Sequence, residues 1–304
     1  MIIKKDKKGS IMTYIVAKDY NDDKMKKILN IKLNNNDDYF IIEDNADVYT
    51  EDNKLLLRFR KNILNKDKID EFYNNVIKFA KMPTHNRGSA SGSKKKNIYE
   101  NGNIYTNIIG YFDTMSPNYK HILTKKGIKN FLSVRPTRFL LNYPDKYKKL
   151  LPFIKEVDKY YKILIPEQYA IQRAHANQTH FKIKGTAFTT ITTNVNYQTT
   201  VHTDKGDDED GFGNLTVIEY GKYTGGETCL PQFGIGVNVR TGDVLYMNVH
   251  EAHGNLPIKL ESPDAIRLSI VCYLRKKIWE KTRGKTRRFF EKHNATFKKI
   301  IVHK

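Results

Sequence analysis

Cysteine is nearly absent from the 304-residue sequence, which contains only Cys229 and Cys272. Each lies inside a strand-like run, so the sequence supports neither a disulfide framework nor a cysteine metal site. Apolar runs are short as well: none approaches the ~18 residues of a membrane span, and the start MIIKKDKKGS lacks the apolar core of a signal peptide. We therefore expect a reducing, intracellular setting, without secretion and without a membrane partner.

Acidic residues are too few to balance the basic ones. The chain has 33 Asp and Glu against 53 Lys and Arg, which gives a net charge of +20. Such an excess favours a polyanionic partner such as nucleic acid, although a merely soluble, lysine-rich protein is the alternative. The basic C-terminal tail, residues 275–304, holds twelve Lys or Arg against two acids. It predicts either a solvated basic helix on the body or an arm that follows phosphates. No feature indicates a protein partner.

The first part of the chain predicts an α/β extension over residues 1–82. A turn at residues 51–53 separates two strand-like runs and predicts a hairpin over residues 47–60. Asn65 is a suitable N-cap, and apolar residues with helical spacing follow it up to Ala80. Residues 83–96 are expected to form a small, basic loop, which is either a linker or a phosphate contact through Arg87 and residues 94–96. Residues 83–304 are expected to form one domain, compact with the extension.

The second half of that domain is rich in short strands. Helical patterns over residues 144–177 precede β-branched or apolar runs, separated by glycine-rich turns, at residues 186–193, 214–220, 235–239, 244–249 and 266–274. Short strands without helices between them are typical of an antiparallel sandwich or jelly roll. We therefore expect an α+β fold, in which a double-stranded β-helix (jelly-roll) core is backed by helices.

The strand-rich region carries one pattern that combines metal-ligating with anion-binding residues. In the extended motif His202-Thr-Asp204, the two outer side chains share one face. His253 follows the run 244–249, and Arg267 and Ser269 share one face of the closing strand. Two histidines and one carboxylate, with positions left open, are typical of non-haem Fe(II) oxygenases. The arginine suits an anionic cosubstrate, whereas surface histidines without a ligand are the alternative.

At these residues the sequence resembles the TET/JBP family of Fe(II)- and 2-oxoglutarate-dependent nucleic-acid base hydroxylases, especially its JBP-like and viral branch. The resemblance is dense over residues 185–276 and includes Tyr223-Thr-Gly-Gly226 and His250-Glu-Ala-His-Gly-Asn255. It implies that His202, Asp204 and His253 hold iron and that Arg267 and Ser269 grip the distal carboxylate of 2-oxoglutarate, with O2 at the remaining position. His253 is preferred to His250 because it precedes the Gly-Asn-x-Pro stretch where the family places its ligand.

The resemblance also implies base-contacting residues, namely Asp207, Tyr273 and Arg275, with Arg87 as a further substrate contact. Arg275 stands where 5-methylcytosine oxidases have histidine, and arginine can only donate hydrogen bonds. Thymine and 5-methylcytosine therefore both stay open. The implied function is hydroxylation of the 5-methyl group of one of these bases in DNA rather than RNA, in the nucleus, the cytoplasm or a viral replication site. Alternatives are the same chemistry on RNA or on a protein side chain, and a non-catalytic nucleic-acid binder.

Overall fold

A computed structural model describes residues 1–34, 38–84, 104–115, 117–128 and 131–301. They form two compact units: unit 1 contains residues 1–107, 193–205 and 212–271, and unit 2 contains residues 108–192, 206–211 and 272–304. Three strands contribute residues to both units, namely β6 (Thr106–Phe112), β8 (Thr190–Val195) and β16 (Ile266–Tyr273). These units cut the chain differently from the expected boundary after residue 82, so that domain division stays a prediction.

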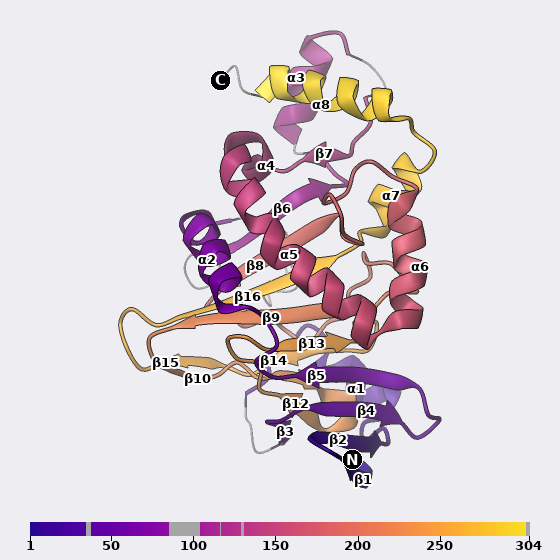
Figure 1. Cartoon of the computed structure of the whole chain (residues 1–304), viewed down its shortest axis with the longest axis vertical. Coiled ribbons are helices and arrows are strands. Elements are labelled where there is room, and N and C mark those ends of the chain that lie inside the picture. Colours follow the sequence, from indigo (N-terminus) through magenta and orange to yellow (C-terminus); the bar gives the residue numbers. More distant parts are fainter. Residues whose placement is uncertain (35–37, 85–103, 116, 129–130, 302–304) are drawn as a thin grey trace. The chain divides into compact units, whose positions relative to one another are not determined.

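Unit 1 contains a large sheet, in which β13, β9 and β16 lie side by side (Figure 1). Its hydrogen-bonded order begins with β1 (Ile2–Lys8), β2 (Ile11–Val16), β4 (Ala46–Thr50), β5 (Leu55–Arg60), β13 (Val244–Met247), β9 (Gly213–Tyr220) and β16, and β8 and β6 continue it. The pairs from β1 to β16 are antiparallel except β2 with β4, which is parallel. The predicted hairpin over residues 47–60 is confirmed as β4 and β5.

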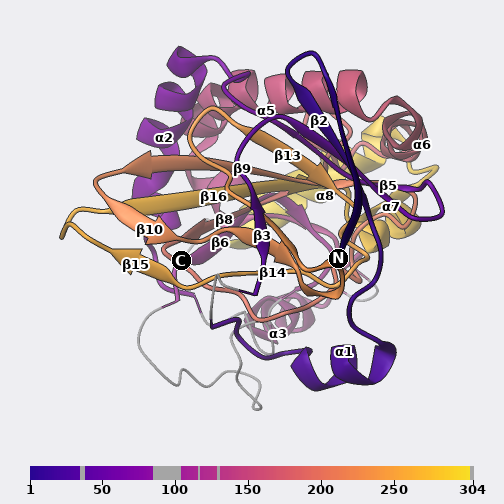
Figure 2. The ribbon, with the colours of Figure 1, turned by 90° about the horizontal axis from the view of Figure 1, so that it is seen from below.

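A second sheet in unit 1 consists of β14 (Gly254–Asn255), β11 (Thr228–Leu230), β12 (Ile235–Val237) and β3 (Phe40–Ile42). Leu230 and Val237 from this sheet share one apolar core with Leu215 and Leu245 from the large sheet. Two sheets are therefore packed against one another, as the jelly-roll prediction requires. The strands β10 (Tyr223–Gly225) and β15 (Ile258–Leu260) form a separate pair (Figure 2), and the short helix η2 (Pro231–Phe233) joins β11 to β12.

Two helices complete unit 1. The predicted helix after Asn65 is confirmed as α2 (Lys66–Ala80), where the Asn65 side chain accepts a hydrogen bond from the Lys68 amide at 3.1 Å. Its apolar residues at helical spacing, including Phe72 and Val76, are buried. The helix α1 (Asp22–Ile28) and the strands β1 and β2 were not predicted, because the exposed, lysine-rich β1 has no alternation of polar and apolar residues.

Unit 2 is mainly helical. Its helices are α3 (Pro117–Lys125), α4 (Arg138–Asn142), α5 (Pro144–Leu164), α6 (Pro166–Asn177), α7 (Lys276–Thr282) and α8 (Arg287–Ile301), and the strand β7 (Arg135–Pro136) pairs with β6. The predicted helical stretch 144–177 is confirmed, and it breaks at Pro166, which opens α6. The predicted strand 186–193 is shifted, because β8 begins only at Thr190.

The basic C-terminal tail is folded. Phe290 packs beside Phe181, and Phe297 is buried with Leu123 of α3, next to which α8 lies in Figure 1. His293 is buried too, and its Nε2 lies 2.7 Å from the carbonyl oxygen of Val134. Residues 276–282 and 287–301 therefore form helices that pack within unit 2 rather than a free arm, and their contact with phosphates stays a prediction. Of the helices that the structure describes, none combines the length and the apolar character needed to cross a membrane.

Candidate active site

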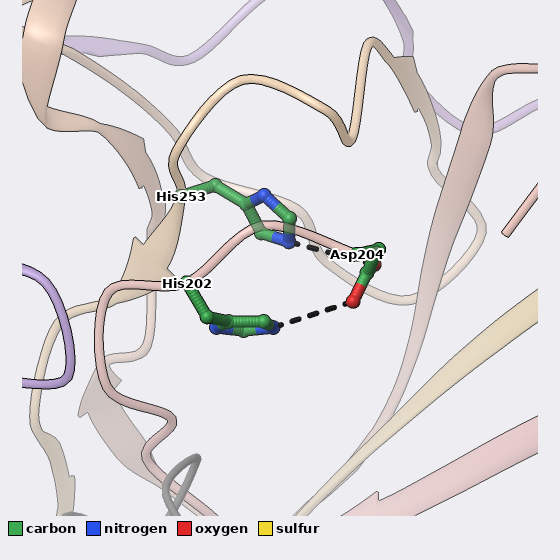
Figure 3. Close-up of side chains that lie close together, drawn as sticks. All are labelled: His202, Asp204 and His253. Atoms are coloured by element: carbon green, nitrogen blue, oxygen red, sulfur yellow. Dashed lines mark ion pairs between the residues drawn. The ribbon is translucent and has the colours of Figure 1, made fainter. Parts of the chain in front are cut away.

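The side chains of His202, Asp204 and His253 come together in unit 1. His202 Nε2 lies 3.6 Å from one carboxylate oxygen of Asp204, and His253 Nε2 lies 3.7 Å from the other. Figure 3 shows both imidazole rings directed toward this carboxylate. One ligand atom from each residue lies within 4.8 Å of the other two, which is close enough for all three to bind one metal ion. The predicted metal group thus has a suitable geometry, which supports the ligand assignment.

The backbone sets the separation of the two histidines. The His202 amide donates to the His253 carbonyl at 2.8 Å, and the His253 amide donates back at 2.9 Å. The Asp204 amide donates to the carbonyl of Val249, at the end of the segment that begins with β13, at 3.0 Å. Main-chain hydrogen bonds therefore place all three side chains at one point, although about fifty residues separate the histidines in the chain.

Hydrogen bonds also fix the protonation pattern of each ring. Nδ1 of His202 lies 2.7 Å from the Thr200 carbonyl, and Nδ1 of His253 lies 2.9 Å from the Glu251 carbonyl. Because a carbonyl only accepts, a neutral ring at either position carries its proton on Nδ1 and has its lone pair on Nε2. This pattern is typical of histidines that bind a metal through Nε2. The donor set therefore fits a divalent ion such as iron.

Arg267 provides a buried positive charge in the same unit. It is 4% exposed, and its Nη2 donates to the Gly226 carbonyl at 2.7 Å. Its neighbour across the sheet, Glu219, accepts hydrogen bonds from Thr241 and Arg240 instead. Within the described part of the chain Arg267 forms no ion pair, and burial lowers its pKa. A buried charge without a partner is unfavourable, so this position favours a bound anion.

Two hydroxyl groups accompany this arginine in unit 1. Ser269 lies two residues further along β16, and its Oγ accepts a hydrogen bond from Asn194 at 3.1 Å. The hydroxyl of Tyr223 is buried and has no hydrogen-bond partner among the described residues. Burial raises the pKa of Tyr223 to about 12, so the hydroxyl remains a donor at neutral pH. Tyr223 was not predicted as a site residue, and the only sequence signal was the Tyr-Thr-Gly-Gly stretch.

Position 226 must be glycine because its backbone lies directly against the side chain of Arg267. Its φ is +81°, and a Cβ atom there would lie 2.7 Å from Arg267 Nε. Any side chain would therefore strain the backbone and displace the guanidinium group. The glycine of this turn thus lets Arg267 lie against the backbone.

The predicted base-contacting residues lie together in unit 2. Asp207 forms an antiparallel bridge with Arg275, and the Asp208 amide donates to the Leu274 carbonyl at 2.9 Å. Tyr273 is 8% exposed, and its hydroxyl is 3.1 Å from Thr192 Oγ1. These roles stay predictions. Arg87, the fourth predicted contact, lies outside the described residues together with most of the loop 83–96.

Two further histidines, His250 and His175, lie outside the group formed by His202, Asp204 and His253. His250 is not part of the metal group, and its amide donates to the Asn248 side chain at 3.1 Å. In unit 2, His175 Nδ1 lies 2.8 Å from Asp208, with the exposed Asp210 nearby, while its ring stacks on Trp279. This second group was not predicted, because no local motif links α6 to residues 206–211. The contact between His175 and Asp208 holds residues 206–211 against α6.

Comparisons with known proteins agree with this geometry. Residues 126–276 match the Tet_JBP family model, described as the oxygenase domain of the 2OGFeDO superfamily. The chain is 33% identical over 190 residues to thymine dioxygenase JBP1-A of Trypanosoma cruzi, covering 62% of this chain and 21% of that protein. It is also 33% identical over 170 residues to the bifunctional helicase and thymine dioxygenase JBP2 of Leishmania braziliensis, covering 56% of this chain and 14% of that protein.

A solved structure shows the same fold. The structure of NgTET1 in complex with 5mC DNA matches with a TM-score of 0.51 and 17% sequence identity, over 84% of this chain and 90% of that one. The predicted fold class, an α+β fold with a jelly-roll core, is confirmed by this match. The chain spans about a fifth of the length of JBP1-A and less of JBP2. The chain therefore carries an oxygenase domain of the Tet_JBP family, within the 2OGFeDO superfamily.

Proposed function

We propose that this protein is an Fe(II)- and 2-oxoglutarate-dependent dioxygenase that hydroxylates the 5-methyl group of a pyrimidine in DNA. Thymine is the first candidate base because the related proteins are named thymine dioxygenases, and 5-methylcytosine is the second. The main support is the group in which two histidines direct Nε2 at Asp204 while Nδ1 bonds a carbonyl. A DNA substrate implies that the protein acts inside a cell or at a site of viral replication.

In this proposal the metal ligands and the anion-binding residues of unit 1 have separate roles. His202, Asp204 and His253 would hold Fe(II), which together with 2-oxoglutarate and O2 supplies the oxidising power to hydroxylate a C–H bond. Arg267 would donate two parallel hydrogen bonds to the distal carboxylate of 2-oxoglutarate, and Ser269 would add a third. The burial of Arg267 strengthens this attraction, since water is excluded from it.

The residues of unit 2 would recognise the base. Asp207 as a carboxylate can accept from N3–H of thymine or from the amine of 5-methylcytosine, while Arg275 donates to a carbonyl or ring nitrogen. Tyr273 would stack on the base. A base that is stacked within a DNA duplex cannot reach the metal group, so the nucleotide must first be rotated out of the double helix. Asp204 and Asp207 are three residues apart in the chain, which links metal binding to base recognition along one segment.

Mass spectrometry of nucleosides tests this function. The protein is incubated with Fe(II), 2-oxoglutarate and DNA that contains thymine or 5-methylcytosine, and parallel reactions contain RNA. The expected products are succinate and a 5-hydroxymethyl pyrimidine from DNA, with none in metal-free controls. Hydroxylation of RNA or of a protein would support the alternative substrates. Nucleic-acid binding without succinate under any condition would identify a non-catalytic binder and refute the proposal.

Tyr223→Phe is expected to raise the KM for 2-oxoglutarate by roughly 3- to 10-fold, because a net hydrogen bond contributes about 1 kcal/mol. The reason is that the buried hydroxyl makes no hydrogen bond of good geometry among the described residues and interacts electrostatically with Arg267, so we expect it to donate to an anion bound by that arginine. The measurement is succinate formation as a function of 2-oxoglutarate concentration. Tyr49→Phe, a change on β4 of the large sheet where the hydroxyl accepts from Arg58, is the control. An unchanged KM in Tyr223→Phe would remove this residue from the cosubstrate site.

The exposed face of α8 is expected to contact DNA phosphates. Arg288, Lys292 and Lys299 are exposed and lie on one side of the helix by their spacing. Each phosphate contact contributes about 0.9 to the slope of log K against log salt. Changing all three residues to Gln should therefore weaken binding and flatten that slope by about three units.

The control carries the same charge change on β1, where Lys4, Lys7 and Lys8 are also exposed. Substitutions are preferable to removing the C-terminal tail, because its removal would expose the apolar surface that Phe290 and Phe297 cover. Binding of each variant to DNA is titrated with salt. Equal slopes for wild type and the α8 variant would assign the phosphate contacts elsewhere.

A further inference from the structure

The side chain of Arg275 is held from several directions within unit 2. Its Nε donates to Asp113 Oδ1 at 2.5 Å, and its guanidinium carbon lies 4.5 Å from the ring centre of Phe112. Its backbone amide donates to Thr189 Oγ1 at 2.9 Å. Asp113 is only 1% exposed, whereas the Arg275 side chain is 23% exposed. One end of the guanidinium is therefore anchored to a buried carboxylate while the group as a whole still reaches solvent.

The opposite side of the guanidinium lies against Gly206. A Cβ atom at that position would be 2.7 Å from Nη1 of Arg275. The Lys276 amide donates to the Gly206 carbonyl at 3.0 Å, which ties this glycine to the same short ladder as Asp207. Gly206 therefore lets the arginine lie close to the segment that carries Asp207, and a larger residue would push it away.

We propose that Asp113 is a positioning residue for base recognition: it fixes Arg275 so that the terminal guanidinium nitrogens, beside the Asp207 carboxylate, donate to acceptor atoms of the target pyrimidine. This inference rests on the proposed function. Within the described residues the terminal nitrogens of Arg275 have no hydrogen-bond partner. A donor next to an acceptor complements the Watson–Crick edge of a pyrimidine, on which N–H groups and oxygen or nitrogen acceptors adjoin.

An anchor is needed because arginine is long and flexible. A free arginine side chain has considerable rotamer entropy, which would be lost each time it ordered on a base. The pairing with Asp113 and the stacking on Phe112 order the group before the base arrives, which improves discrimination between bases. Burial acts to lower the pKa of Arg275, but Tyr273, Asp113 and Asp207 raise it above its ordinary value, so the group stays a donor.

The test compares Asp113→Asn with wild type in DNA that contains equal amounts of thymine and 5-methylcytosine at the target position. Charge-assisted hydrogen bonds contribute about 1.5–3 kcal/mol. We therefore expect the KM for DNA to rise by about 10-fold or more and the ratio of the two hydroxymethyl products to change. Asp113→Glu, which keeps the charge, should restore part of that ratio. Ser133→Ala is the control, because it removes the hydroxyl that donates to the Asp113 carbonyl and accepts from Lys281, while it leaves the Asp113 carboxylate unchanged.

A double-mutant cycle separates positioning from a general effect on folding. If Asp113 acts through Arg275, then Asp113→Asn should no longer alter the product ratio in an Arg275→His background. An equal change in both backgrounds, or the same change in Ser133→Ala, would overturn the inference. Wild-type succinate and hydroxymethyl products are measured first. Their absence would overturn the proposed function and this inference with it, whereas normal products with an unchanged ratio in Asp113→Asn would overturn the inference alone.

Discussion

His202→Ala is expected to lose iron binding and, with it, all metal-dependent turnover. Residues that only support a ligand already change metal affinity by 10- to 100-fold, so removing a ligand should lower it by more than about 100-fold. Fe(II) binding is measured by anaerobic titration and turnover by succinate formation. His250→Ala is the matched control, because His250 lies three residues from the ligand His253 in the chain but outside the metal group. Full activity in His202→Ala would refute the ligand assignment.

Arg267→Lys is expected to raise the KM for 2-oxoglutarate by roughly 10- to 100-fold, while the rate at saturating cosubstrate changes much less. Lysine keeps the charge but cannot form two parallel hydrogen bonds with a carboxylate, and charge-assisted bonds contribute about 1.5–3 kcal/mol. The rise should appear in both succinate and hydroxylated product. Arg60→Lys, another largely buried arginine, which pairs with Asp47 instead, is the control. An unchanged KM would place the cosubstrate carboxylate elsewhere.

Much of the fold follows from local patterns in the sequence. Helix α2 has both a capping residue, Asn65, and a regular apolar stripe, and its predicted and observed limits agree. The strands β9 and β16 were predicted for a similar reason, since both are runs of β-branched and apolar residues, and glycines lie at both ends of β9. The strand β1 was missed because its lysines are exposed on both faces, so pairing with β2 alone decides its structure.

The metal group was also accessible from the sequence, because an extended His-x-Asp motif directs its outer side chains to one face. The expected strand is not there, since His202 forms only an isolated bridge with His253 and Asp204 lies outside any strand. The partner histidine was less certain, since two candidates lie three residues apart. What distinguishes them is the pair of main-chain hydrogen bonds between residues 202 and 253, which no local pattern predicts.

Contacts between distant segments explain the rest. Asp113 and Arg275 are 162 residues apart, and nothing near Asp113 in the sequence indicates that it pairs with an arginine. The same holds for His175 with Asp208, which are separated by 33 residues. Tyr223 could be seen in the sequence, but its burial without a hydrogen-bond partner, which makes it a candidate donor, could not.

The main-chain bonds between residues 202 and 253 have a thermodynamic consequence. Because the backbone and the two carbonyl contacts already hold both rings with Nε2 directed at Asp204, little conformational entropy is left to lose when an ion binds. In zinc-finger-like domains, by contrast, the free energy of metal binding is spent on folding the chain. Here the binding of the ion would add to the stability of a site that is already ordered, rather than supply the free energy that orders it.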